Sequence, residues 1–243
     1  MSSKKWIIIG ISGATCSGKT YLTNKLHKEL KNSVIIQQDN YFLPIDDPRH
    51  TKVPKLKCLN WEILTSIDMD KMRSDILKLI ESSPNKETVA KTNDKNVLII
   101  DGFLLFKCEV ISNLCDQKYF LTITKDECWM RRKDRSYNPP DVPGYFENVV
   151  WPEYLKHLDE LMKDKDLYKT ITFLDGSKTF FFFLFFVNHN EICVHHFRFY
   201  DKYICTCHCW NINNEPDFMN SHENALVQVD VAYLFFVRHV IIS

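Results

Sequence analysis

A glycine loop near the start of the chain constrains the fold more than any other feature. Residues 13–20 read GATCSGKT and match the pattern G-x-x-x-x-G-K-[ST]. The loop follows a short apolar run, residues 6–11, and precedes a helical pattern that carries Leu22, Leu26 and Leu30. A strand, a glycine loop and a helix in this order form the context of a phosphate-binding loop. The segment is therefore predicted to bind a nucleoside triphosphate.

The residue types in this loop suit that chemistry. Glycines let successive backbone N–H groups curl around a phosphate, and the following helix N-terminus adds partial positive charge. Lys19 is expected to reach the β- and γ-phosphates of ATP, and the Thr20 hydroxyl to bind Mg²⁺. The plainer alternative is a glycine-rich turn before an ordinary helix. The candidate ATP-binding residues here are Gly13, Ala14, Thr15, Cys16, Ser17, Gly18, Lys19, Thr20 and Tyr21.

Apolar strand patterns alternate with helical patterns along the first two thirds of the chain. Strands are predicted at residues 6–11, 34–36, 97–102, 119–123 and 168–174. Helices are predicted at residues 18–31, 61–82, 125–136 and 147–165. This alternation indicates an α/β fold of the P-loop NTPase type, with a parallel sheet flanked by helices and ligands at the carboxyl ends of the strands.

Two aspartates and one basic run are expected to meet the phosphates. Asp101 ends an apolar strand, the position of a Walker B carboxylate that acts on Mg²⁺ directly or through water. Asp39 also follows a strand and could accept the proton of an attacking hydroxyl. The basic run 131–135 follows the next strand, where a lid helix would place arginines on phosphate oxygens. The alternatives are turn-capping aspartates and a solvated helix face.

Composition excludes several classes of partner. The formal net charge is zero, which argues against a dedicated nucleic-acid or membrane-surface binder. The nine cysteines show no spacing typical of a disulfide scaffold, so free thiols in the cytoplasm are expected. No apolar stretch reaches the length of a membrane span. The expected partners are a small-molecule nucleoside and a nucleotide.

Eight segments carry a family resemblance, in order along the chain. They are GISGATCSGKT (10–20), QQDNYF (37–42), LNWE (59–62), LIIDGFLLF (98–106), YFLTI (119–123), RRKDRSYNPPDVPGYF (131–146), VWPEYL (150–155) and LDGSK (174–178). Together they resemble the nicotinamide riboside kinases, within the uridine-kinase-like P-loop kinases. The phosphate loop alone is generic, whereas the GFLLF strand and the Y-x-PPD-x-PGYF segment are specific.

The resemblance implies an ATP- and Mg²⁺-dependent phosphorylation of nicotinamide riboside, and of nicotinic acid riboside, at the 5′-hydroxyl during NAD biosynthesis. Lys19 and Asp39 are implied as catalytic residues. The implied substrate-binding residues are Asp39, Asn40, Tyr41, Phe42, Trp61, Glu62, Arg132, Tyr137 and Asn138. Further implied ATP contacts are Arg131, Arg135 and Lys178. The implied metal ligands are Thr20, Asp39 and Asp101, although relatives often carry glutamate at the last position.

The residue types at the implied substrate site also suit nicotinamide riboside. The nicotinamide ring of the riboside is a pyridinium cation, which Trp61 and Tyr137 could bind by stacking and cation–π attraction. The alternative is that Trp61 is the first core residue of its helix. Two other functions remain open: a kinase for uridine or another nucleoside, and a catalytically idle nucleotide-binding interaction protein.

The composition changes abruptly after Lys178. The expected organisation is a P-loop nucleoside kinase domain, residues 1–178, and an atypical Phe/Cys/His-rich tail, residues 179–243. The tail holds a phenylalanine-rich run at 180–186 and is interpreted as disordered, or as an artefact of the gene model such as an alternative exon or translated non-coding sequence. A metal site could be built from His195, His196, Cys205, Cys207, His208 and Cys209, but their spacing does not match common zinc patterns.

Overall fold

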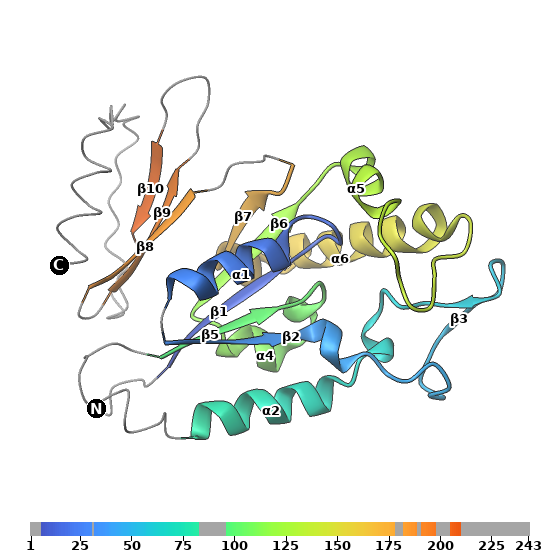
Figure 1. The fold of residues 1–243 in the computed structure, drawn as a ribbon, viewed down its shortest axis with the longest axis horizontal. Helices are drawn as coiled ribbons and strands as arrows, with labels where there is room; N and C mark the ends of the chain where they lie inside the picture. The colour runs from blue at the N-terminus through green and yellow to red at the C-terminus, as the bar shows by residue number, and fades with distance from the viewer. Residues whose placement is uncertain are drawn as a thin grey trace. The chain divides into compact units, whose positions relative to one another are not determined.

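The computed structural model describes residues 6–30, 32–82 and 96–177 with their side chains, and three strands beyond them by their backbone (Figure 1). The chain divides into two compact units, Met1–Ser177 and Lys178–Ser243. Each unit is described by itself.

A five-stranded parallel sheet forms the centre of the first unit, in the order β2-β5-β1-β6-β7. Its strands are β1 (Trp6–Gly13), β2 (Ser33–Gln37), β5 (Asn96–Asp101), β6 (Gln117–Thr122) and β7 (Ile171–Asp175). Every residue of β1 is buried, as expected for a central strand covered on both faces. The predicted α/β fold with a parallel sheet is confirmed. Strand β2 lies at the edge of the sheet, and its residue Val34 is half-exposed.

Helices follow the strands and flank this sheet (Figure 1). They are α1 (Lys19–Glu29), α2 (Met69–Glu81), α4 (Glu109–Leu114), α5 (Lys125–Arg132), α6 (Trp151–Lys163) and α7 (Lys165–Lys169). Short helical turns η1 (Gln38–Tyr41), η2 (Leu64–Ser66), η3 (Leu105–Lys107) and η4 (Phe146–Val150), and a hairpin of β3 (Lys52–Val53) and β4 (Cys58–Leu59), complete the unit. Several helices start at side-chain caps, for example Thr124, which accepts a hydrogen bond from the Glu127 N–H at the start of α5.

The predicted helix at 61–82 is wrong in its first third. The Ser66 hydroxyl donates to the carbonyls of Asn60 (2.9 Å) and Ile63 (2.8 Å), and the Asn60 side chain accepts from the Glu62 N–H (3.0 Å). Such side-chain-to-backbone bonds compete with helix formation, so helix α2 begins only at Met69, after its cap Asp68. Trp61 therefore lies on an irregular segment before the helix.

Three other predicted boundaries also differ. Helix α5 ends at Arg132 rather than near 136. The first residues of the predicted helix 147–165 form the π-helical turn η4, and the rest divides into α6 and α7, where Asp164 ends the first helix and caps the second. Strand β7 begins at Ile171 because Tyr168 belongs to α7.

The second unit contains a three-stranded antiparallel sheet in the order β10-β9-β8. The strands are β8 (Phe182–Asn188), β9 (Glu191–Phe197) and β10 (Cys205–Cys209). The side chains of the candidate metal ligands in this unit lie outside the described residues. Among the helices that the structure describes, none has the length and apolar character needed to cross a membrane.

Candidate active site

The glycine loop connects β1 to α1 at the carboxyl edge of the sheet. Gly13 has φ +127, and a Cβ on it would lie 2.2 Å from the carbonyl oxygen of Leu121. The next residue, Ala14, donates its N–H to that same carbonyl (3.1 Å). Gly18 has φ +97 at the start of α1, a conformation that favours glycine. The two glycines thus allow the loop to turn tightly over β6 and present its backbone to a phosphate.

Lys19 and Thr20 face the carboxylate of Asp101. The Lys19 Nζ donates to the Ala14 carbonyl oxygen of its own loop (2.6 Å). Burial lowers the pKa of Lys19, while Asp101 and Asp39 oppose that shift. Burial raises the pKa of Asp101, opposed by the charge of Lys19 and by a hydrogen bond from the Thr20 side chain. A cation and two carboxylates therefore gather beside the phosphate loop.

Asp39 reaches this group from turn η1, directly after β2. Its neighbour Gln38 is fully buried and accepts a hydrogen bond from the Leu104 N–H (2.9 Å), which ties η1 to the segment after β5. Strands β2 and β5 are neighbours in the parallel sheet, so their carboxyl ends bring Asp39 and Asp101 to one edge. The two predicted carboxylates thus lie on the same side of the sheet as the loop.

The oxygen donors of Thr20, Asp39 and Asp101 are hard ligands of the kind that Mg²⁺ prefers. Among the residues that the structure describes, no group of three or more His, Cys, Asp or Glu side chains could hold a metal ion. A magnesium ion in a kinase site commonly takes only one or two carboxylates together with substrate phosphates. The donor set therefore fits Mg²⁺ bound with a nucleotide, and its role as a metal site stays a prediction.

Arg131 braces the phosphate loop from helix α5. Its Nη1 donates to the carbonyl oxygens of Cys16 (3.1 Å) and Gly176 (2.9 Å), and its Nη2 to Glu127 (2.6 Å). Gly176 itself approaches the loop so closely that a Cβ on it would lie 2.3 Å from the Ser17 carbonyl oxygen. The guanidinium predicted to contact ATP thus holds the loop to the end of β7, while Lys178 lies outside the described residues.

Arg132 is the centre of a buried charge cluster. Its Nε and Nη2 donate to the two carboxylate oxygens of Asp141 (2.8 and 3.1 Å), and its Nη1 donates to the Thr15 hydroxyl (3.1 Å). A second carboxylate, Glu62, lies 3.5 Å from Nη2, and the ring of Tyr137 lies 4.3 Å from the guanidinium carbon. One cation is therefore shared by two carboxylates.

The charge of Arg132 compensates Glu62 only in part, and the Glu62 side chain is only 12% exposed. Burial, opposed by the charge of Arg132 and reinforced by that of Asp141, raises the pKa of Glu62 to about 7. Because the Asp141 carboxylate takes both of the closest Arg132 contacts, Glu62 stays under-compensated. The cluster is thus suited to a ligand that brings a positive charge.

Trp61 is held in place by aromatic neighbours and by one backbone hydrogen bond. The centroid of its ring lies 5.8 Å from that of Phe42, edge-on, and 4.5 Å from that of His50 at 66°. The backbone N–H of Trp61 donates to the hydroxyl of Tyr145 (2.9 Å). Phe42 in turn stacks on Phe103, with centroids 6.0 Å apart. These contacts orient an aromatic face beside the charge cluster.

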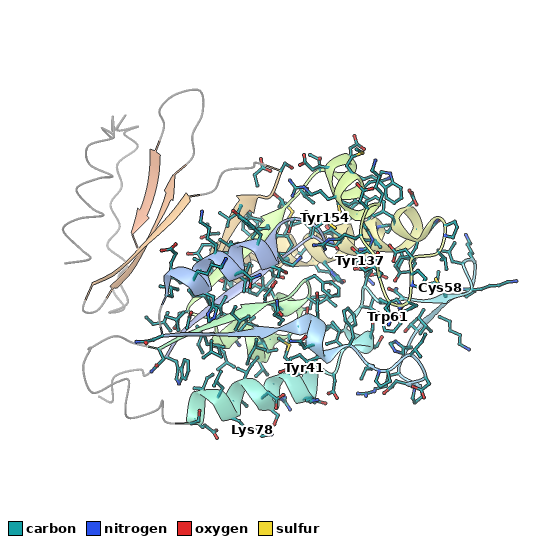
Figure 2. The ribbon with its side chains drawn as sticks, in the orientation of Figure 1. Tyr41, Cys58, Trp61, Lys78, Tyr137 and Tyr154 are labelled. Carbon is teal, nitrogen blue, oxygen red and sulfur yellow. The ribbon has the colours of Figure 1, made fainter. Side chains whose placement is uncertain are left out.

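A cavity of about 660 Å³ brings most of the predicted residues together. The predicted residues that line it are Thr15, Cys16, Gly18, Lys19, Thr20, Tyr21, Asp39, Phe42, Trp61, Glu62, Asp101, Arg131, Arg132, Arg135, Tyr137 and Asn138. Gly13, Ala14, Ser17, Asn40 and Tyr41 are not among its lining residues. Figure 2 shows Trp61 and Tyr137 near each other, while Tyr41 lies toward α2, where its hydroxyl donates to Asp75 (3.2 Å).

Sequence reasoning missed several lining residues. Phe103, Asp141 and Tyr145 all line the cavity, and they lie inside segments that carry the family resemblance, GFLLF and PPD-x-PGYF. An aspartate two residues before a proline would pass for a turn residue, so only the pairing with Arg132 reveals its role.

Curated relatives match the chain over most of its length. Nicotinamide riboside kinase 1 from Homo sapiens is 40% identical over 180 residues, covering 72% of this chain and 86% of the relative. Nicotinamide riboside kinase 2 from Mus musculus is 38% identical over 180 residues, covering 71% and 89%. A uridine kinase from Mycoplasma pneumoniae is 26% identical over 187 residues, covering 69% and 86%. No protein-family model matches the chain.

Proposed function

This chain belongs to the nicotinamide riboside kinase family, and we propose that it transfers the γ-phosphoryl group of ATP to the 5′-hydroxyl of nicotinamide riboside, and of nicotinic acid riboside, in NAD biosynthesis. The observation that supports this most directly is an aromatic cavity beside the phosphate loop in which Arg132 faces both Glu62 and Asp141. The five cysteines whose side chains the structure describes are free thiols, which agrees with a reducing compartment such as the cytoplasm.

The charge of this cavity favours a pyridinium over a neutral base. Glu62 and Asp141 share the guanidinium of Arg132 beside Trp61, so this cluster carries an excess negative charge once both carboxyls are ionised; Lys19, Arg131 and Arg135 are the other cations that line the cavity. A nicotinamide ring carries a positive charge, and each good cation–π contact contributes about 0.5–2 kcal/mol. A uracil ring can stack on the same side chain but brings no charge to Glu62. The nicotinamide riboside is therefore the better fit.

The proposed mechanism depends on positioning and charge neutralisation, since the transition state of phosphoryl transfer is loose. Lys19 holds the β- and γ-phosphate oxygens, the loop N–H groups bind phosphate, and Arg135 faces the same cavity. Asp39 orients the 5′-hydroxyl and accepts its proton. Thr20, Asp39 and Asp101 would hold Mg²⁺, which neutralises negative charge on the phosphates. Glu62 and Arg132 bind the ribose hydroxyls.

A side-by-side assay of nicotinamide riboside and uridine, each with ATP and Mg²⁺, tests this function. We expect phosphorylation of the riboside with a higher kcat/KM than that of uridine, because the pyridinium, unlike uracil, adds a positive charge beside the two carboxylates that share Arg132. Faster turnover of uridine would instead identify a uridine kinase. Binding of ATP with no phosphorylation of any nucleoside would indicate an idle nucleotide-binding protein.

The raised pKa of Glu62 predicts a pH dependence of substrate binding. Above pH 7 the Glu62 carboxyl is ionised and attracts the pyridinium; as the pH falls through the pKa of about 7 it takes up a proton and that attraction is lost. The KM for nicotinamide riboside should therefore rise by up to about tenfold between pH 8 and pH 6. In Glu62→Gln the KM should be high and nearly constant over this range. A wild-type KM that does not change with pH would contradict the prediction.

A further inference from the structure

His50 contacts the aromatic wall of the site from outside the cavity. The centroid of its ring lies 4.5 Å from that of Trp61 at an interplanar angle of 66°. Its Nε2 donates to the carbonyl oxygen of Pro44 (2.9 Å), and its backbone N–H donates to the carbonyl oxygen of Asp47 (3.2 Å). His50 is thus fixed at the end of the loop that follows Phe42, with its ring against Trp61.

His50 differs from the other neighbours of Trp61 in its position relative to the cavity. Phe42 and Tyr145 contact Trp61 and also line the cavity, so they can touch a bound nucleoside directly. His50 does not line it. Its Nδ1 is buried and has no hydrogen-bond partner within the described part of the chain, so the imidazole is held only through Nε2 and ring packing. An effect of His50 on the substrate would pass either through Trp61 or, by the hydrogen bond to Pro44, through the adjacent Ile45, which lines the cavity.

We propose that His50 is a positioning residue for the pyridine ring of the substrate. By packing against Trp61 it keeps the indole in the orientation that stacks on the ligand, and this proposal rests on the proposed function. Trp61 needs such support because its segment is irregular rather than helical, so helix packing does not fix its side chain. A pre-oriented ring loses less conformational freedom on binding, which lowers the KM without altering the chemical step.

Two substitutions separate the ring contact of His50 from its hydrogen bond. His50→Phe keeps an aromatic ring against Trp61 but removes the bond to Pro44, and should keep the KM for nicotinamide riboside within about twofold of the wild type. His50→Ala removes both, and should raise that KM about threefold to tenfold, as expected for loss of an aromatic pair. The kcat and the KM for ATP should stay unchanged in both variants. Arg49→Ala is the matched control.

Arg49 is suited to that control because it lies next to His50 in the same loop. Its guanidinium pairs with the Asp47 carboxylate on the surface (2.8 Å), and it does not line the cavity. Its removal should leave both KM values at their wild-type levels. A rise in KM equal to that of His50→Ala would show that the loop as a whole, not the imidazole, matters, and would overturn the proposal.

A double-mutant cycle with Trp61→Ala tests whether His50 acts on the KM for nicotinamide riboside through Trp61. Trp61→Ala alone should raise the KM for nicotinamide riboside, and adding His50→Ala should raise it no further. An equal additional rise would mean that His50 acts elsewhere, and a fall of kcat together with a higher KM for ATP would indicate a general structural role; either result overturns the proposal. If Trp61→Ala leaves the KM unchanged, the proposed ring site itself is wrong, and His50 loses its role with it.

Discussion

Lys19→Ala should nearly abolish phosphoryl transfer and weaken ATP binding. The ammonium of Lys19 lies beside the phosphate loop, 2.6 Å from the Ala14 carbonyl oxygen, and Asp101 and Asp39 stabilise its charge against burial. On binding a nucleotide, it can exchange that carbonyl for phosphate oxygens at little cost in reorganisation. Loss of one such preorganised group typically lowers kcat about 10²–10³-fold. We expect at least that loss, together with weaker ATP binding.

Steady-state kinetics and calorimetric titration with ATP check this result. Lys28→Ala is a matched control, since Lys28 is an exposed lysine in the last turn of the same helix α1, at the end opposite the loop. The control should keep both kcat and ATP affinity. Normal turnover by Lys19→Ala would mean that the glycine loop does not hold the reacting phosphates.

Asp39→Ala should lower kcat at least about a hundredfold while ATP still binds. Proton transfer by a positioned base contributes about 10²–10⁴-fold, and Asp39 lines the cavity together with Lys19 of the phosphate loop and Trp61. Because its turn is fixed by the buried Gln38, the carboxylate is held at the cavity wall, where the proposed mechanism brings the 5′-hydroxyl to the γ-phosphate. The loss should therefore fall on turnover rather than on nucleotide affinity.

Two further variants sharpen the test of Asp39. Asp39→Asn keeps an oxygen that can orient the hydroxyl but cannot take its proton, so its residual activity separates orientation from base catalysis. Asp46→Ala is the control, because Asp46 is an exposed aspartate in the following loop that does not line the cavity. Single-turnover measurements with saturating ATP report the chemical step. Near-normal turnover of Asp39→Ala would remove Asp39 from the mechanism.

The parts of the fold that could be predicted from the sequence are those with local signals. The glycine loop, the mostly apolar strands β1 and β5, and the aspartate at the end of β5 are each visible in a few consecutive residues. Since the carboxyl ends of parallel strands share one edge, the grouping of Lys19, Asp39 and Asp101 followed from this order alone.

The parts that could not be predicted depend on pairing between distant segments. The hydrogen bonds that keep Trp61 out of a helix come from Asn60 and Ser66, whose pattern reads as helical by hydrophobic spacing alone. Likewise, a run of basic residues gives no sign that Arg131 binds loop carbonyls while Arg132 is buried against Asp141. Apolar periodicity records which residues are buried, but not which polar partners they find.

The irregular stretch that carries Trp61 has a consequence for how such an enzyme can diversify. The groups proposed to act on the phosphates include Lys19, Asp39 and Asp101 at the edge of the sheet, whereas the indole proposed to face the base lies on a separate segment that is held by hydrogen bonds of its own polar side chains. Mutations in that segment could exchange one preferred base for another while the transfer chemistry stays intact. Catalysis and base choice are thereby free to evolve as separate modules.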